Sequence, residues 1–355
     1  MRTPLAFVET GDDALVSVAA PLVPVDSPRS GAPAFFAPPF SMASVGPWWY
    51  ECDLSSPMTL SRAEWRERFP AVPSAPAASL AWRQPDEARF AAGFRTLAAL
   101  LERGSLRKGV PITVMTAPVA AADAPALFAY LLGRVPMLPH SLSAYGFFRP
   151  ASDTGTGSPE FLIGATPETL FEIAGDRRLM TMAVAGTRRA GGSAISLEDS
   201  AKDRDEHQTV VDDLMGQLSA WGRPAASAVQ VRSFGELEHL AVDIRVDADR
   251  ALDFEAVARR LHPTPALGVY PRSLEGADWL AGIDPHGDRK RFGAPFGLRW
   301  PSGDGRCLVA IRSLQYCDGR LEIWAGCGVV PQSRYDQEWQ EVLDKMHAVR
   351  ALWGV

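Results

Sequence analysis

The sequence predicts a globular protein of the α+β class, because it combines antiparallel hairpins with separate amphipathic helices. Asp318-Gly319 and Gly175-Asp176 mark two hairpins, each between runs of apolar and β-branched residues. Helical periodicity is clearest over residues 86–101, 254–261 and 335–349, and a further helix ends near Leu218. With 355 residues, of which 46% are hydrophobic, the chain can bury a large core.

The first part of the chain differs from the rest in composition. Residues 1–80 are rich in Pro, Ala and Ser, which predicts short strands and loops packed on the main domain. Residues 81–355 contain no repeat, low-complexity tract or linker-like run. We therefore expect them to form one compact domain.

Composition excludes several classes of protein. The net charge of −6 comes with no basic stripe, so we expect no nucleic-acid partner. No apolar run approaches the roughly 20 residues that span a bilayer, and acids interrupt the amino terminus where a signal peptide would be apolar. These features predict a cytoplasmic protein without a membrane segment. Its cysteines include no CxxC pair and are expected to be reduced, small hydrophobic residues.

Residues 307–347 predict much of one charged site. If the Asp318-Gly319 turn has two residues, Arg312 lies opposite Ala325, beside the run Gly326-Cys327-Gly328, whose glycines leave the backbone open to a ligand. On the helix that follows, the side chains at spacing i, i+3 and i+7 share one face, and they are Glu338, Glu341 and Lys345. Alone, such charges are usually a solvated surface with weak ion pairs. A functional site needs partners from elsewhere in the chain.

Several candidate partners lie earlier in the sequence. Lys108 stands at the start of a strand, and pairing across the Gly175-Asp176 turn would bring Glu168 near the loop that contains Gly186 and Thr187. Glu206 lies where the charged start of a helix gives way to an apolar stripe. Each also has a simpler explanation, since exposed lysines, strand interruptions and acidic helix starts are common.

The two histidines of interest have different surroundings. His239 lies in an apolar strand, where a histidine is usually a core residue with satisfied hydrogen bonds. His262 begins the run His-Pro-Thr-Pro-Ala-Leu-Gly, and the prolines fix its loop. A rigid loop suits a histidine that faces a pocket.

Taken together, a set of ordered motifs resembles the chorismate-binding enzymes, which include isochorismate and salicylate synthases and the large chains of anthranilate and aminodeoxychorismate synthases. The resemblance covers residues 85–355. The motifs are GATPETL, VAGTRR, KDRDEHQTVVDDL, LHPTPALG, AIRS and AGCGVV followed by EWQEVLDK. The resemblance implies two antiparallel sheets packed as a sandwich, with helices outside and the site in a cleft between the sheets.

The resemblance also implies a role for each candidate residue. Lys108 is similar to the family's base and Glu168 to its acid, and His262 would lie against the chorismate ring. Mg²⁺ would be held by Glu206 and Glu341, with Glu338 assisting directly or through water. The carboxylates of chorismate would be held by side chains or backbone at Gly186, Thr187, Arg312, Gly326, Gly328 and Lys345.

Within this family, the residues favour an isochorismate synthase that feeds siderophore, salicylate or menaquinone synthesis. Lys108 stands where ammonia-using members commonly have Gln, and Ala185 lacks the lysine of the aminodeoxychorismate branch. We therefore expect no glutaminase partner, and a monomer or homodimer. A salicylate synthase, an ammonia-using synthase and a non-catalytic chorismate-binding protein remain alternatives. Three departures from the family pattern are Val269, Cys327 and the run Gly109-Val-Pro111 after Lys108.

Overall fold

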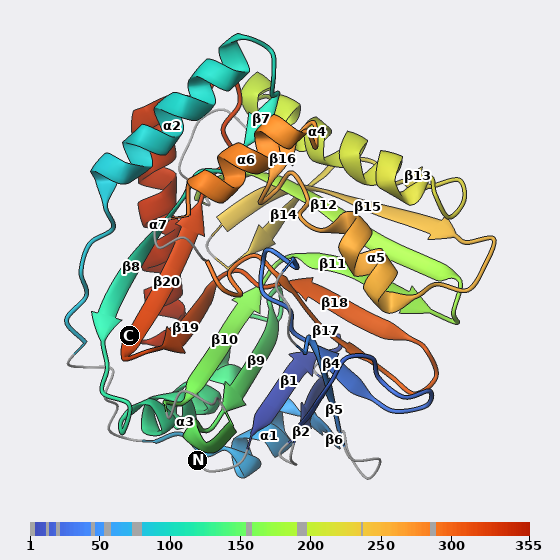
Figure 1. Cartoon of the computed structure of the whole chain (residues 1–355), viewed down its shortest axis with the longest axis vertical. Coiled ribbons are helices and arrows are strands. Elements are labelled where there is room, and N and C mark those ends of the chain that lie inside the picture. The colour runs from blue at the N-terminus through green and yellow to red at the C-terminus, as the bar shows by residue number, and fades with distance from the viewer. Residues whose placement is uncertain are drawn as a thin grey trace.

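Two antiparallel sheets lie face to face in the computed structural model, and helices cover their outer sides (Figure 1). The structure describes residues 4–11, 14–18, 22–43, 47–52, 58–72, 80–153, 158–189, 197–235, 237–284 and 289–355.

The first sheet has eight strands. In spatial order they are β6 (Met58–Ser61), β2 (Ala14–Val18), β1 (Leu5–Glu9), β9 (Ser143–Arg149), β10 (Glu160–Thr166), β19 (Ser313–Cys317), β20 (Arg320–Gly326) and β8 (Ile112–Pro118). The β19–β20 hairpin has the predicted two-residue turn, in which Asp318 and Gly319 have φ values of 51° and 77°. Positive φ at both positions is typical of a type I′ turn, which matches the twist of the strands.

The second sheet has ten strands. In spatial order they are β13 (Ala225–Ala226), β15 (Leu237–Asp247), β12 (Arg178–Arg189), β11 (Thr169–Ala174), β18 (Gly305–Val309), β17 (Pro295–Arg299), β4 (Ala34–Phe36), β5 (Trp49–Glu51) and β3 (Val23–Val25), with β14 (Gln230–Phe234) also paired to β15. A separate pair consists of β7 (Lys108–Gly109) and β16 (Val269–Tyr270).

Large side chains fill the space between the sheets. The rings of Tyr50 and Phe147 lie 4.9 Å apart, and those of Tyr145 and Phe296 lie 5.3 Å apart, each pair joining one sheet to the other. The predicted sandwich of two antiparallel sheets is therefore confirmed. Residues 1–80 are more than a cover on it, because β1, β2 and β6 belong to the first sheet and β3, β4 and β5 to the second.

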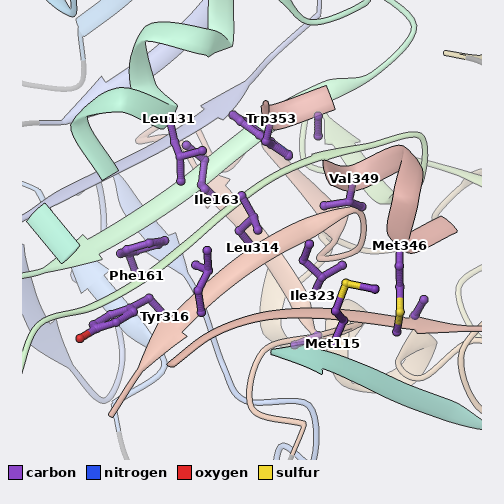
Figure 2. Packing of buried hydrophobic residues seen from close by; sticks show 14 of the residues in the cluster. Met115, Leu131, Phe161, Ile163, Leu314, Tyr316, Ile323, Met346, Val349 and Trp353 are labelled. Carbon is purple, nitrogen blue, oxygen red and sulfur yellow. The ribbon is translucent and has the colours of Figure 1, made fainter. Parts of the chain in front are cut away.

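Helices bury the outer faces of both sheets. The core outside the first sheet includes residues of α1 (Arg62–Arg68), α2 (Glu87–Glu102), α3 (Ala124–Arg134) and α7 (Tyr335–Trp353). The core outside the second sheet includes residues of α4 (Ala201–Leu218) and α5 (Phe254–Leu261), while α6 (Leu274–Gly282) contacts β16. In the first of these cores, Met346, Val349 and Trp353 of α7 pack over the side chains of the β19–β20 hairpin (Figure 2).

Helix α7 is longer than predicted. It begins at Tyr335 as expected but continues past residue 349 to Trp353, and Gly354 ends it in the left-handed conformation with φ 67°. The cysteines Cys52, Cys307, Cys317 and Cys327 are all free. Within the described ranges, no helix combines the length and the apolar character that crossing a membrane requires.

Candidate active site

The candidate site lies where the chain crosses from one sheet to the other. Pro167 and Glu168 connect β10 of the first sheet to β11 of the second, and Arg312 lies between β18 of the second sheet and β19 of the first. Arg312 has φ 55°, a conformation that costs a non-glycine residue about 1–2 kcal/mol. Such strain is concentrated at functional sites. Both crossovers line one cavity between the sheets.

Most of the predicted site residues meet around this cavity. They are Lys108, Glu168, Gly186, Thr187, Glu206, Arg312, Gly326, Gly328 and Lys345. The free space that they enclose is only ≈ 70 Å³. Because small-molecule pockets usually have volumes of about 300–1,000 Å³, this cavity is narrow for a six-membered ring with two carboxylates.

Lys108 is held at the base of the cavity. Strand β7 carries it, through pairing with β16 on one side and a bridge from Gly109 to Val329 on the other. Its side chain is fully buried, and Nζ lies 3.0 Å from Oε1 of Glu206. A side chain at Gly328 would collide with that carboxylate and with Cε of Lys108. The glycine therefore makes room for an ion pair.

The two carboxyl groups nearest Lys108 differ in protonation. Burial raises the pKa of Glu168 to about 7, although the charges of Lys108 and Lys345 oppose this rise. Burial would also raise the pKa of Glu206, but the charges of Lys108 and Lys202 outweigh it and hold this pKa below its usual value. Near neutral pH, Glu168 can therefore donate a proton while Glu206 is ionised. Separated pKa values of this kind are typical of acid–base sites.

Two cations give the cavity an affinity for anions. Nζ of Lys345 lies 2.6 Å from Oε1 of Glu341 and 2.9 Å from the carbonyl oxygen of Gly326. Burial lowers the pKa of Arg312 to about 10, so its guanidinium is still charged at neutral pH. An arginine and a lysine at one cavity suit a ligand with two carboxylates.

The acids proposed as metal ligands are paired with lysines. Glu206 pairs with Lys108, Glu341 with Lys345, and the fully buried Glu338 with Lys202, whose Nζ lies 2.5 Å from Oε1. Three carboxylates are the right kind of donor for Mg²⁺. Over the described ranges, however, no group of three or more Asp, Glu, His or Cys side chains is arranged to hold a metal ion. The arrangement therefore does not fit a metal until these lysines are displaced.

The acids and Lys202 affect one another's pKa values. Burial, followed by the charge of Glu341, raises the pKa of Glu338 to about 7. Burial opposes the charged form of Lys202, but the carboxylates of Glu338, Glu206 and Glu341 together raise its pKa. Lys202 is therefore a member of this cluster that the sequence analysis missed. Its position four residues before Glu206 places both on one face of α4, which is the signal that could have revealed it.

The prediction for His262 needs correction, because this residue lies at a different cavity. Its Nε2 is 2.7 Å from the carbonyl oxygen of Phe40, and its ring packs edge-on against the Phe40 ring. Burial lowers the pKa of His262 to about 4, so the ring is neutral. The loop does reach the candidate site, but through Ala266 and Leu267. His262 is the C-cap residue of α5, and its side chain contacts Phe40 instead of the candidate cavity.

His239 lines the candidate cavity instead, although its sequence context predicted a core residue. It lies opposite Thr187 in the β12–β15 pairing, next to an irregularity between Ala185 and Thr187. Nδ1 is 3.0 Å from the Gly186 carbonyl oxygen, whereas the buried Nε2 has no hydrogen-bond partner among the described residues. Burial and the nearby Arg312 and Lys345 charges lower the pKa of His239 well below its usual value. The neutral ring therefore presents Nε2 as an acceptor.

The departures at Val269 and Cys327 affect the packing around the site. Both side chains are buried in the core outside the first sheet, and neither lines the candidate cavity. Val269 packs against α6, where a side chain at Gly276 would collide with it. Val269 therefore helps to seat α6 against β16 and does not shape the candidate cavity.

Comparison with known proteins identifies the family. The family model described as "Chorismate binding enzyme" matches residues 154–353. The chain belongs to this family. Among chorismate-binding enzymes, the salicylate biosynthesis isochorismate synthase of Pseudomonas aeruginosa is 36% identical to it over 197 residues, which is 53% of this chain and 41% of that protein. Isochorismate synthase EntC of Escherichia coli K12 is 28% identical over 244 residues, 66% of this chain and 59% of that protein. These matches thus span about half the length of the relatives.

Solved structures share the fold over nearly the whole chain. A putative 2,3-dihydroxybenzoate-specific isochorismate synthase, DhbC from Bacillus anthracis, superposes with a TM-score of 0.79 at 19% identity, covering 98% of this chain and 96% of that one. Anthranilate synthase component I from Streptococcus pneumoniae has a TM-score of 0.69 at 15% identity, covering 99% and 92%. The fold is therefore that of the chorismate-binding enzymes, including the strands that precede residue 154.

Proposed function

We propose that this chorismate-binding enzyme is an isochorismate synthase, which adds water at C2 of chorismate and expels the hydroxyl at C4. The observation that carries the proposal is one buried cavity in which a lysine and a protonatable glutamate lie beside two cations. Lys108 and Glu168 supply the acid–base pair, and Arg312 and Lys345 supply the positive charge.

The reaction exchanges one water for another. Lys108 takes a proton from the attacking water as its oxygen bonds to C2, the ring double bonds shift, and the C4 oxygen leaves as water with a proton from Glu168. Lys108 must be neutral to act as the base, so its ion pair with Glu206 has to open first. The neutral His239 can accept a hydrogen bond from a substrate hydroxyl through its unpartnered Nε2.

Mg²⁺ belongs to the proposal as the cofactor. Glu206, Glu338 and Glu341 are the side chains that would hold it, after they release their lysines. Bound there, the ion would supply positive charge for a carboxylate of chorismate. Arg312, Lys345 and the backbone at Gly186 and Gly328 would hold the rest of the dianion.

Two observations favour water over ammonia as the nucleophile. Lys108 is a base suited to activating water, and relatives at 36% and 30% identity are named isochorismate synthases. A component I of anthranilate synthase from Saccharomyces cerevisiae also matches, at 28% identity over 202 residues. Enzymes that use either nucleophile thus match this chain, and Lys108 is the residue on which the choice of water rests.

The test is to incubate purified protein with chorismate and Mg²⁺, with and without ammonium, and to separate the products by chromatography. We expect isochorismate without ammonium, and none when EDTA is present. The matched variant Lys108→Met keeps the volume of the side chain and should abolish turnover while chorismate still binds. Salicylate plus pyruvate would change the proposed product, and a product that requires ammonium would overturn the choice of nucleophile.

A further inference from the structure

We propose that Lys202 is a built-in counter-cation that occupies the carboxylate cluster of Glu206, Glu338 and Glu341, and that a divalent cation binds there only by displacing its ammonium group. The inference rests on the proposed function for the identity of the ion, Mg²⁺. It concerns how the protein neutralises this cluster when no ion is bound.

The contact between Lys202 and Glu338 is the first step of the argument. The Glu338 side chain is 1% exposed, and the ammonium of Lys202 lies 2.5 Å from Oε1. Apart from this ion pair, neither carboxylate oxygen of Glu338 has a hydrogen-bond partner among the described residues. A buried carboxylate without a positive partner is strongly unfavourable. Lys202 therefore supplies the charge that makes the buried position of Glu338 tolerable.

The second step is that Lys202 acts on the whole cluster. Its ammonium lies in the field of Glu338, Glu206 and Glu341 together. The other two lysines each pair with one acid of the cluster, Lys108 with Glu206 and Lys345 with Glu341. Lys202 thus contacts Glu338 directly, and its charge also acts on Glu206 and Glu341, so its ammonium opposes any other cation that these acids would bind.

The third step is that the ammonium has somewhere to go. Lys202 also lines a neighbouring open cavity of ≈ 970 Å³ whose walls carry further acids. These are Asp199, Asp203, Asp336 and Asp344. The Lys202 side chain is 22% exposed, and a lysine carries its charge on a flexible four-carbon stem. The ammonium can therefore swing out of the cluster and remain near negative charge.

The structure thus predicts a competition between an internal monovalent cation and an external divalent one. Metal binding must supply the free energy that breaks the Lys202 contact, so removal of the ammonium should raise the affinity for the metal. In the absence of metal, the same removal takes positive charge away from three neighbouring carboxylates and should destabilise the fold. Linkage makes the two effects reciprocal.

The experiment compares wild type with Lys202→Met, which keeps the length of the side chain but removes its charge. Titration calorimetry with MgCl₂ and no chorismate measures metal affinity, and thermal melts in EDTA and in MgCl₂ measure stability. We expect Lys202→Met to bind Mg²⁺ about tenfold or more tightly, a typical size for such coupling. We also expect it to melt at a lower temperature in EDTA and to gain more from Mg²⁺ than wild type.

Two further variants serve as controls. Lys202→Arg keeps the charge and should leave the Mg²⁺ affinity within a few-fold of wild type. Arg103→Met removes a cation from an exposed ion pair with Glu275 and should change neither quantity.

The outcomes separate this inference from the proposed function. Mg²⁺ binding by wild type with equal or weaker binding by folded Lys202→Met would overturn the counter-cation role and leave the magnesium proposal standing. Binding by neither protein would overturn both. Detectable binding by Lys202→Met alone would support the inference, since the competition would then be strong enough to mask the site in wild type.

Discussion

Glu168 shows how burial changes the protonation of a carboxyl group. Its carboxyl group lies at a crossover between the sheets, and burial raises its pKa from 4.5 to about 7. Between these two values the folded protein holds a proton that the unfolded chain would release. The resulting contribution to stability is present below about pH 4.5 and is lost as the pH rises through about 7.

From this pKa we predict that turnover of chorismate falls as the pH rises through about 7, because Glu168 loses the proton that it must donate. Glu168→Gln should keep chorismate binding but lower kcat by roughly 10²–10⁴-fold, the usual contribution of a general acid. Its stability, measured by urea unfolding at pH 5 and pH 8, should depend less on pH than that of wild type. A variant with unchanged kcat would show that another group protonates the leaving oxygen.

At the same scale, the sequence predicts the types of residue better than their orientation. The motifs pointed to Lys108, Glu168 and Arg312, and all three line the candidate cavity. Which of His262 and His239 lines this cavity could not be predicted, since it depends on which side of a loop or strand faces the cavity. His262 is directed to Phe40 by the end of α5, and His239 is brought to Thr187 by the strand pairing.

Helix α7 shows what periodicity reveals about an element and what it leaves out. The spacing of Glu338, Glu341 and Lys345 correctly placed them on one face, but the helix extends further than its apolar pattern suggested. The extra turn ends in Trp353, whose side chain is fully buried in the same hydrophobic cluster as Val349 and Leu131 (Figure 2). The burial of Trp353 and the left-handed Gly354 that follows it together set the end of the helix.

We predict that the last turn of α7 contributes strongly to the stability of the protein, because it packs α7 against the β19–β20 hairpin. Trp353→Ala should lower the free energy of unfolding by about 3–5 kcal/mol, because it removes a fully buried indole and leaves a cavity. Gln337→Ala, on the exposed side of the same helix, should change it by less than about 0.5 kcal/mol. Urea titrations followed by circular dichroism measure both. Equal effects of the two substitutions would contradict the packing that anchors Glu338 and Glu341.

Over the whole molecule, the site depends on the chain passing repeatedly between the two sheets. The hairpins that form local parts of each sheet could be predicted from their turns. The assignment of β10 and β11 to different sheets could not, because the short connection at Pro167 and Glu168 has no sequence signal for a crossover. The resemblance to chorismate-binding enzymes implied two packed sheets but not this assignment, which follows from the pairing of β11 with β18 and of β10 with β19.

The same crossing of the sheets makes residues 1–80 a structural part of the site's scaffold, although the family match begins at residue 154. Strand β1 pairs with β9, and β4 pairs with β17, so the segment contributes to both sheets. Phe7, Phe35 and Phe36 on these strands are fully buried. A chain limited to residues 81–355 would expose their partners and leave two long sheet edges unpaired.

We therefore predict that residues 81–355, expressed alone, do not fold into a chorismate-binding domain. The fragment should aggregate, or show no cooperative thermal transition by circular dichroism and increased binding of the dye ANS, which reports exposed apolar surface. Full-length protein provides the reference for each measurement. A fragment that melts cooperatively and binds chorismate with the affinity of the full chain would show that the strands before residue 81 only cover a core that is already complete.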